Sequence, residues 1–151
     1  MRVSHPLNPR SEIFMKRLGD PTGMTRIGVN LARIPPGKES FAPHAHSVQE
    51  EWVYVLEGTG RALVGEEEHE IGPGDFLGFP TDGVAHHLRN TGTTDLVVLQ
   101  GSERSRVDVG HFPTLKKRLL FLGDDVVRLV PEDAIETLPL TAWRAKDPDG
   151  T

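Results

Sequence analysis

Short apolar runs separated by turn residues are the feature that most narrows what this chain can fold into. Glycine and proline supply 16 and 12 of its 151 residues, well above their usual joint share of about 12%. They stand between the runs, as turn residues do in a β-protein. The expected strands cover 27–34, 41–46, 51–57, 61–65, 69–71, 76–80, 84–90 and 95–101. Strands at this spacing predict an all-β sandwich or barrel.

The two ends of the chain are less regular. Residues 1–25 are polar except for a short apolar run, Ile13, Phe14 and Met15. Beyond residue 105, the segments 107–112 and 126–130 have the composition of strands. The segment PEDAIETL (131–138) opens with proline, as the first turn of a helix often does. This region could wrap the barrel or pair with a partner chain, and the sequence does not choose between them.

The chain is predicted to form one domain. No internal repeat or low-complexity linker divides residues 1–151, and this length suits a single hydrophobic core. We expect a barrel core at about 27–101, preceded by an N-terminal extension and followed by a C-terminal extension over about 102–151.

Composition excludes several classes of function. The net charge of −5 argues against a nucleic-acid partner, because binding phosphates requires a basic surface. No basic amphipathic helix, signal peptide or transmembrane run is present in the sequence, so we expect no membrane partner and a cytoplasmic protein. The absence of cysteine excludes disulfides, thiolate ligands and a cysteine nucleophile.

Three histidines and a glutamate point to a metal site. His44 and His46 share one face if their segment is extended, because side chains at i and i+2 of a strand point the same way. Glu51 begins the next run and His86 comes from a later strand. Imidazoles with one carboxylate suit Fe, Mn, Ni, Cu or Zn, whereas Ca and Mg favour an all-oxygen shell.

Strand alternation selects the carboxylate. Glu51 shares a face with Val53 and Val55, which suit a barrel interior, whereas Glu50 shares the other face with Tyr54. Glu51 is therefore the predicted ligand.

The same alternation selects between two adjacent histidines. His86 shares a face with Leu88 and Asn90, whereas His87 shares its face with Arg89. An interior with leucine is more favourable than one with arginine, so His86 is the predicted ligand. His87 is interpreted as a histidine behind the ligands or at the surface.

At these two stretches the chain resembles the cupin superfamily, in particular its small single-domain bacterial members. The first cupin motif is matched by Gly37, His44, His46, Glu51 and Gly58, with one extra residue after Gly37. The second is matched by Gly74, Pro80, Gly83, His86 and Asn90, with one extra residue after Pro80. In our interpretation Gly58, Gly74 and Gly83 permit positive φ in tight turns, and Asn90 caps the turn after it.

The resemblance implies an antiparallel double-stranded β-helix, or jelly roll, that binds one divalent metal (Fe, Mn, Ni or Zn) through His44, His46, Glu51 and His86. Four protein ligands leave two positions of an octahedral metal for a substrate, whereas four-coordinate zinc would be nearly closed. Related small cupins commonly form homodimers, and the outward residues Trp52, Tyr54 and Leu56 would suit the interface.

Two functions follow as hypotheses. The first is a metal-dependent enzyme for a small oxygen-rich metabolite, with dioxygenase-type or sugar-phosphate-isomerase-type chemistry. Isomerisation also needs a proton carrier, and Glu50, Tyr54 and His87 are the nearby candidates. The alternative is a non-catalytic sensor or binding module with a metal-anchored small molecule. A purely structural metal is a third possibility.

Overall fold

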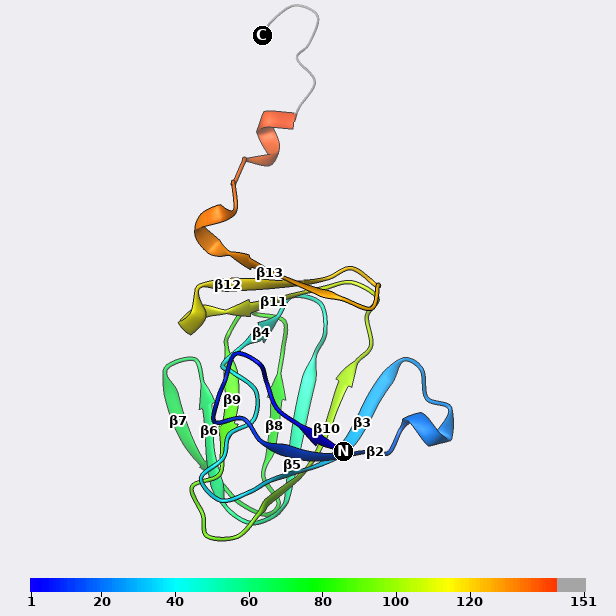
Figure 1. The fold of residues 1–151 in the computed structure, drawn as a ribbon, viewed down its shortest axis with the longest axis vertical. Coiled ribbons are helices and arrows are strands. Elements are labelled where there is room, and N and C mark those ends of the chain that lie inside the picture. Colours follow the sequence, from blue (N-terminus) through cyan, green and yellow to red (C-terminus); the bar gives the residue numbers. More distant parts are fainter. Residues whose placement is uncertain (144–151) are drawn as a thin grey trace, which may run out of the picture.

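The chain forms three antiparallel β-sheets, as Figure 1 shows for the computed structural model, which describes residues 1–143. In chain order the strands are β1 (Arg2–Val3), β2 (Ile13–Arg17), β3 (Ile27–Ile34), β4 (Ala45–His46), β5 (Glu51–Glu57), β6 (Gly60–Val64), β7 (Glu67–Ile71), β8 (Phe76–Phe79), β9 (His86–Arg89), β10 (Leu96–Glu103), β11 (Asp108–Phe112), β12 (Lys117–Phe121) and β13 (Val127–Pro131). The helical segments in this range are the 3-10 turns η1 (Asp20–Thr22), η2 (Pro113–Leu115), η3 (Glu132–Ala134) and η4 (Leu140–Trp143). Within the described range, no helix has the length and apolar character that crossing a membrane requires. The predicted all-β antiparallel fold is confirmed.

Two of the sheets enclose the core. A six-stranded sheet has the order β1-β2-β3-β10-β5-β8, and a three-stranded sheet has the order β7-β6-β9. Both contribute to one apolar cluster, which contains Val55 and Val98 from the first sheet and Ala62 and Leu88 from the second. Burying a valine or leucine side chain of this cluster contributes about 1.5–3 kcal/mol to stability. The core therefore lies between these two sheets.

A third sheet joins the C-terminal region to the barrel. It has the order β13-β12-β11-β4, and it lies across one end of the barrel in Figure 1. Strand β11 pairs with β4 through Gly110 opposite His46 and His111 opposite Ala45. Residues 108–131 thus extend the barrel at strand β4. The exact boundary between core and extension, at residues 101 and 102, stays a prediction.

Strand β5 follows the predicted alternation. Val53 and Val55 are buried, whereas Tyr54 and Leu56 are 39% and 40% exposed. Glu51 is two residues from Val53 and ends the inward row, at the edge of the core. The period of two residues thus directs this carboxylate into the barrel.

The predicted strand at 41–46 was mostly wrong. Only Ala45–His46 forms a strand, preceded by a single bridge between His44 and His86. Pro43 has no backbone N–H, so a continuous ladder cannot run through it, and residues 40–43 bend instead.

Sequence reasoning also missed strands near both ends. The short apolar run near the N-terminus is part of β2, which pairs with β3, and β12 was not expected at all. The helix suggested by PEDAIETL is limited to the single turn η3. Only Glu132–Ala134 is helical after Pro131, and a helix this short has little stability of its own.

A buried carboxylate ties the N-terminal segment to β9. Glu39 is 6% exposed and accepts hydrogen bonds from Asn8 at 3.1 Å, Arg10 at 3.2 Å and Arg89 at 3.1 Å. Burial raises the pKa of Glu39. The hydrogen bonds from Asn8 and Arg10 and the electrostatic effects of His87 and Arg89 outweigh burial, so that the pKa is lowered overall. These partners compensate the buried charge of Glu39, and removing one of them would leave that charge uncompensated.

Tight turns at Gly58, Gly74 and Gly83 have φ of 77°, 95° and 85°, which confirms the role predicted for these glycines. Gly58 also has no room for a side chain, because an added Cβ would lie 2.2 Å from the Asp95 carbonyl oxygen. At Gly74 an added Cβ would meet nothing within 4 Å.

The substitution Gly58→Ala should therefore destabilise the protein more than Gly74→Ala. Positive φ alone costs an alanine about 1–2 kcal/mol, and the collision at position 58 should add about 1–3 kcal/mol. Urea unfolding of both variants measures the difference. Equal losses of stability at the two positions would contradict this account of Gly58.

Candidate metal centre

Backbone pairing brings the two halves of the site together. The His44 N–H donates to the His86 carbonyl oxygen at 3.2 Å, and the His86 N–H donates to the His44 carbonyl oxygen at 2.8 Å. The pair aligns the short β4 segment with β9, and the centroids of the two rings lie 4.8 Å apart. His46, at the end of β4, and Glu51, at the start of β5, complete the set.

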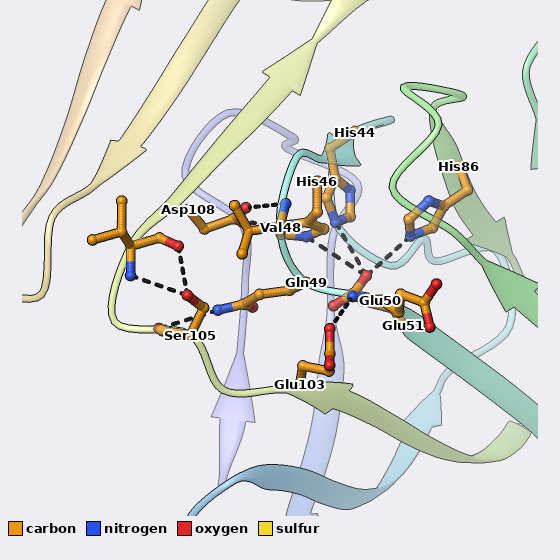
Figure 2. A network of polar contacts seen from close by, with 11 residues as sticks. His44, His46, Val48, Gln49, Glu50, Glu51, His86, Glu103, Ser105 and Asp108 are labelled. Atoms are coloured by element: carbon orange, nitrogen blue, oxygen red, sulfur yellow. Dashed lines mark hydrogen bonds and ion pairs between the residues drawn. The ribbon is translucent and has the colours of Figure 1, made fainter.

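Three imidazoles converge on one carboxylate oxygen. The Nε2 atoms of His44, His46 and His86 lie 3.7, 3.6 and 3.0 Å from Glu51 Oε2. Figure 2 shows all three rings directed at this carboxylate. Ligand atoms of His44, Glu51 and His86 all lie within 4.8 Å of one another, so this group could hold a metal ion. We call the four residues the histidine–glutamate cluster.

The hydrogen-bond partners of Nδ1 determine the tautomers of His44 and His46. His44 Nδ1 lies 2.8 Å from the Ala42 carbonyl oxygen, and His46 Nδ1 contacts Asp108 Oδ2. A carbonyl or a carboxylate oxygen only accepts, so each Nδ1 carries the hydrogen and donates it. The lone pair of each Nε2 is then available toward Glu51, as a metal ligand requires.

His86 is held by packing instead. Its ring stacks on Phe79 with centroids 3.7 Å apart and planes 2° apart, and its buried Nδ1 has no hydrogen-bond partner among residues 1–143. Burial lowers the pKa of His86, against the opposing effect of its hydrogen bond with Glu51. The neutral imidazole that ligates metals is therefore favoured at this position.

Glu51 is ionised. Burial raises the pKa of this carboxyl, but the hydrogen bond from His86 and the nearby imidazoles of His44 and His46 hold the pKa far below its usual range. A carboxylate surrounded by three imidazoles is a cation-binding arrangement. Its donors are those that suit a transition metal.

Comparison with known proteins places the chain in a family. Residues 30–100 match the Cupin domain family. Protein SchB of Streptomyces halstedii is 34% identical over 113 residues, which are 72% of this chain and 80% of SchB. The chain belongs to the cupin superfamily. This confirms the resemblance seen in its two motifs, which lie almost entirely within the matched range.

Two solved cupin structures are similar over nearly their whole length. One is a putative sugar phosphate isomerase from Acidithiobacillus ferrooxidans, with 40% identity, 91% of this chain and 88% of that chain covered, and a TM-score of 0.87. The other is a sugar phosphate isomerase from Silicibacter pomeroyi, with 26% identity, 91% and 92% covered, and a TM-score of 0.79. Both matches extend well beyond the Cupin domain into the terminal regions.

A small cavity adjoins the cluster inside this cupin barrel. Its volume is about 60 Å³, and His44, Glu51 and His86 form part of its wall. The other lining residues are Ile13, Ser40, Phe41, Trp52, Val53, Phe79, His87, Leu88, Gln100, Gly101 and Ser102. Within the described residues, neither lysine nor arginine contributes to this wall. The cavity thus offers a few hydroxyl, amide and imidazole groups on a mainly apolar surface, beside a possible metal.

The three residues named as catalytic candidates lie in different environments. Glu50 is exposed, and its backbone N–H donates to a carboxylate oxygen of Glu103 at 3.1 Å. Tyr54 is on the outer face of β5 and is itself one of the residues expected at a dimer interface. That interface stays a prediction. His87 is buried and lines the cavity, so its surface alternative was wrong. Burial lowers the pKa of His87.

Sequence reasoning missed Asp108. This residue is 4% exposed, and it contacts His46 across the pairing of β4 with β11 (Figure 2). A local signal existed, because Asp108, Gly110 and Phe112 alternate as the buried face of β11. An acidic residue on such a face needs a buried partner. The sequence could not say which partner.

Proposed function

We propose that this cupin is a metal-dependent enzyme acting on a small oxygen-rich metabolite, and that the histidine–glutamate cluster binds one divalent transition metal. The observation that carries the proposal is the convergence of three Nε2 atoms on Glu51 Oε2, at 3.0 to 3.7 Å. Two of the three imidazoles have their Nδ1 hydrogen committed to an acceptor. The donor atoms are thus oriented by the protein, as in an effective metal site.

Within that function we propose isomerase-type chemistry on a sugar-phosphate-like substrate. A metal held by the cluster would supply Lewis acidity to neighbouring carbonyl and hydroxyl oxygens of the substrate. The names of the two similar structures, at 40% and 26% identity, support this choice over dioxygenation.

His87 is the proposed proton carrier for such an isomerisation. It lines the cavity, whereas Glu50 and Tyr54 are absent from its wall. His87 Nδ1 makes a long contact of 3.4 Å with the Phe41 carbonyl oxygen. That contact assigns the ring hydrogen to Nδ1 and leaves the lone pair on Nε2, which is the form that accepts a proton.

The ligand assignment predicts different effects for the adjacent histidines. His86→Ala should lower the affinity for Mn²⁺ or Ni²⁺ by more than about tenfold, because it removes a donor, and His87→Ala should lower it less. Calorimetric titration of the metal-free variants measures both affinities. The control His69→Ala removes an exposed histidine at the β6–β7 hairpin and should change neither affinity nor folding. A larger loss in His87→Ala than in His86→Ala would refute the alternation argument.

Turnover tests the chemistry. Incubated anaerobically with Mn²⁺ in D₂O, the protein should exchange the C2 hydrogen of an aldose phosphate, or a C1 hydrogen of the corresponding ketose phosphate, for deuterium, as seen by proton NMR. His87→Gln should retain the metal but lose about 10²–10⁴-fold in rate, the usual contribution of a general acid–base group.

Two other results would overturn the proposed chemistry. Oxygen uptake with Fe²⁺ on catechols or diketones, without isotope exchange, would assign a dioxygenase. If neither isotope exchange nor oxygen uptake is detected and the protein binds a small acid tightly, it is a non-catalytic binding protein.

A further inference from the structure

We propose that Asp108 is a positioning residue that fixes the tautomer and orientation of His46, and that it makes β11 part of the metal centre. This role rests on the proposed function where it takes His46 to be a ligand. Asp108 lies outside residues 30–100, the range matched by the Cupin domain. The residue therefore belongs to the C-terminal region and not to either motif.

Both oxygens of the Asp108 carboxylate are engaged. Oδ2 contacts His46 Nδ1, and Oδ1 accepts the backbone N–H of Val48 at 3.0 Å. A neighbouring backbone bond, from the Ser47 N–H to the Val109 carbonyl oxygen at 3.1 Å, holds the same two segments together. Only 4% of Asp108 is exposed, so water has little access to its carboxylate, and the two contacts define the plane of that group. A fixed acceptor at Nδ1 of an imidazole also fixes the orientation of the ring, and with it the direction in which Nε2 points.

The chemical consequence lies at His46 Nε2. The carboxylate accepts only, so His46 must place its hydrogen on Nδ1. Its Nε2 then carries a lone pair, 3.6 Å from Glu51 Oε2. The opposite tautomer would point an N–H at the position where a metal would bind. Asp108 thus selects the one neutral form of His46 that can act as a ligand.

Among the Nδ1 contacts of the three histidines, the contact with Asp108 is made by a side chain and can therefore be changed by mutation. The corresponding partner of His44 is the backbone carbonyl of Ala42, and His86 Nδ1 has no partner within the described chain. A side-chain substitution at position 108 therefore changes the outer contact of one imidazole and leaves the other two unaltered.

Nitrogen-15 NMR of metal-free protein is the first test. At about pH 9, above the usual imidazole pKa, wild-type His46 should show the Nδ1–H tautomer. In Asp108→Asn the amide oxygen can still accept the Val48 N–H, and the NH₂ group then faces His46 Nδ1. This nitrogen must now accept, so His46 should change to the Nε2–H tautomer, whereas Asp108→Glu should keep the wild-type form. An Nε2–H tautomer in the wild type, or one unchanged tautomer in all three proteins, would overturn the proposal.

Metal affinity is the second test. Asp108→Asn should weaken Mn²⁺ binding by about 10–100-fold, and Asp108→Glu should recover part of the loss. The matched control Glu39→Gln alters another buried carboxylate, away from the cluster, and should lower the melting temperature without the same loss of affinity. If Asp108→Asn changes the tautomer and leaves the affinity unaltered, the proposed role is overturned.

The two tests separate this role from the proposed function. If wild-type protein binds no metal, the proposed function fails, and the wild-type NMR spectrum still decides whether Asp108 fixes His46. If Asp108→Asn does not fold, the same wild-type spectrum and that of Asp108→Glu remain decisive.

Discussion

The negative charge of the Glu51 carboxylate organises this end of the molecule. Glu51 ends the inward row of β5, and a carboxylate in that position is stable only if partners offset its loss of hydration. The partners are three imidazoles, within 3.0 to 3.7 Å of one carboxylate oxygen. Strands β4, β5 and β9, which carry or adjoin these residues, belong to three different sheets. Strands β4, β5 and β9 must therefore all be in register before the charge is compensated.

The terminal regions support this centre from outside the barrel. The N-terminal segment is bound to β9 through the hydrogen bonds of Glu39, and Ile13 of β2 adds to the core. In the C-terminal region, β11 pairs with β4 and places Asp108 behind His46. Each region contacts a strand that carries a residue of the histidine–glutamate cluster. This cupin therefore uses residues beyond its two motifs to orient the side chains within them.

Much of the fold was predictable because strands have a period of two residues. The limits of β3 and β5 agree with the sequence prediction, and the alternation in β5 places Glu51, not Glu50, beside the three imidazoles. In β9 the burial does not alternate, because His86, His87 and Leu88 are all buried, so the choice of His86 over His87 stays a prediction. The errors have physical causes. Pro43 interrupts the ladder expected over 41–46, and in β12 every residue is only partly buried, so no alternation marks it. The contact between His46 and Asp108 spans 62 residues and depends on how β11 pairs with β4, which a local pattern cannot encode.

The central claim is that the histidine–glutamate cluster is a transition-metal site. Elemental analysis of protein purified without added metal, followed by a melting curve with and without that metal, tests this claim most directly. We predict close to one equivalent of Fe, Mn, Ni or Zn per chain and a higher melting temperature when the metal is bound. A metal content at trace level, with a melting temperature that no added transition metal raises, would contradict the claim.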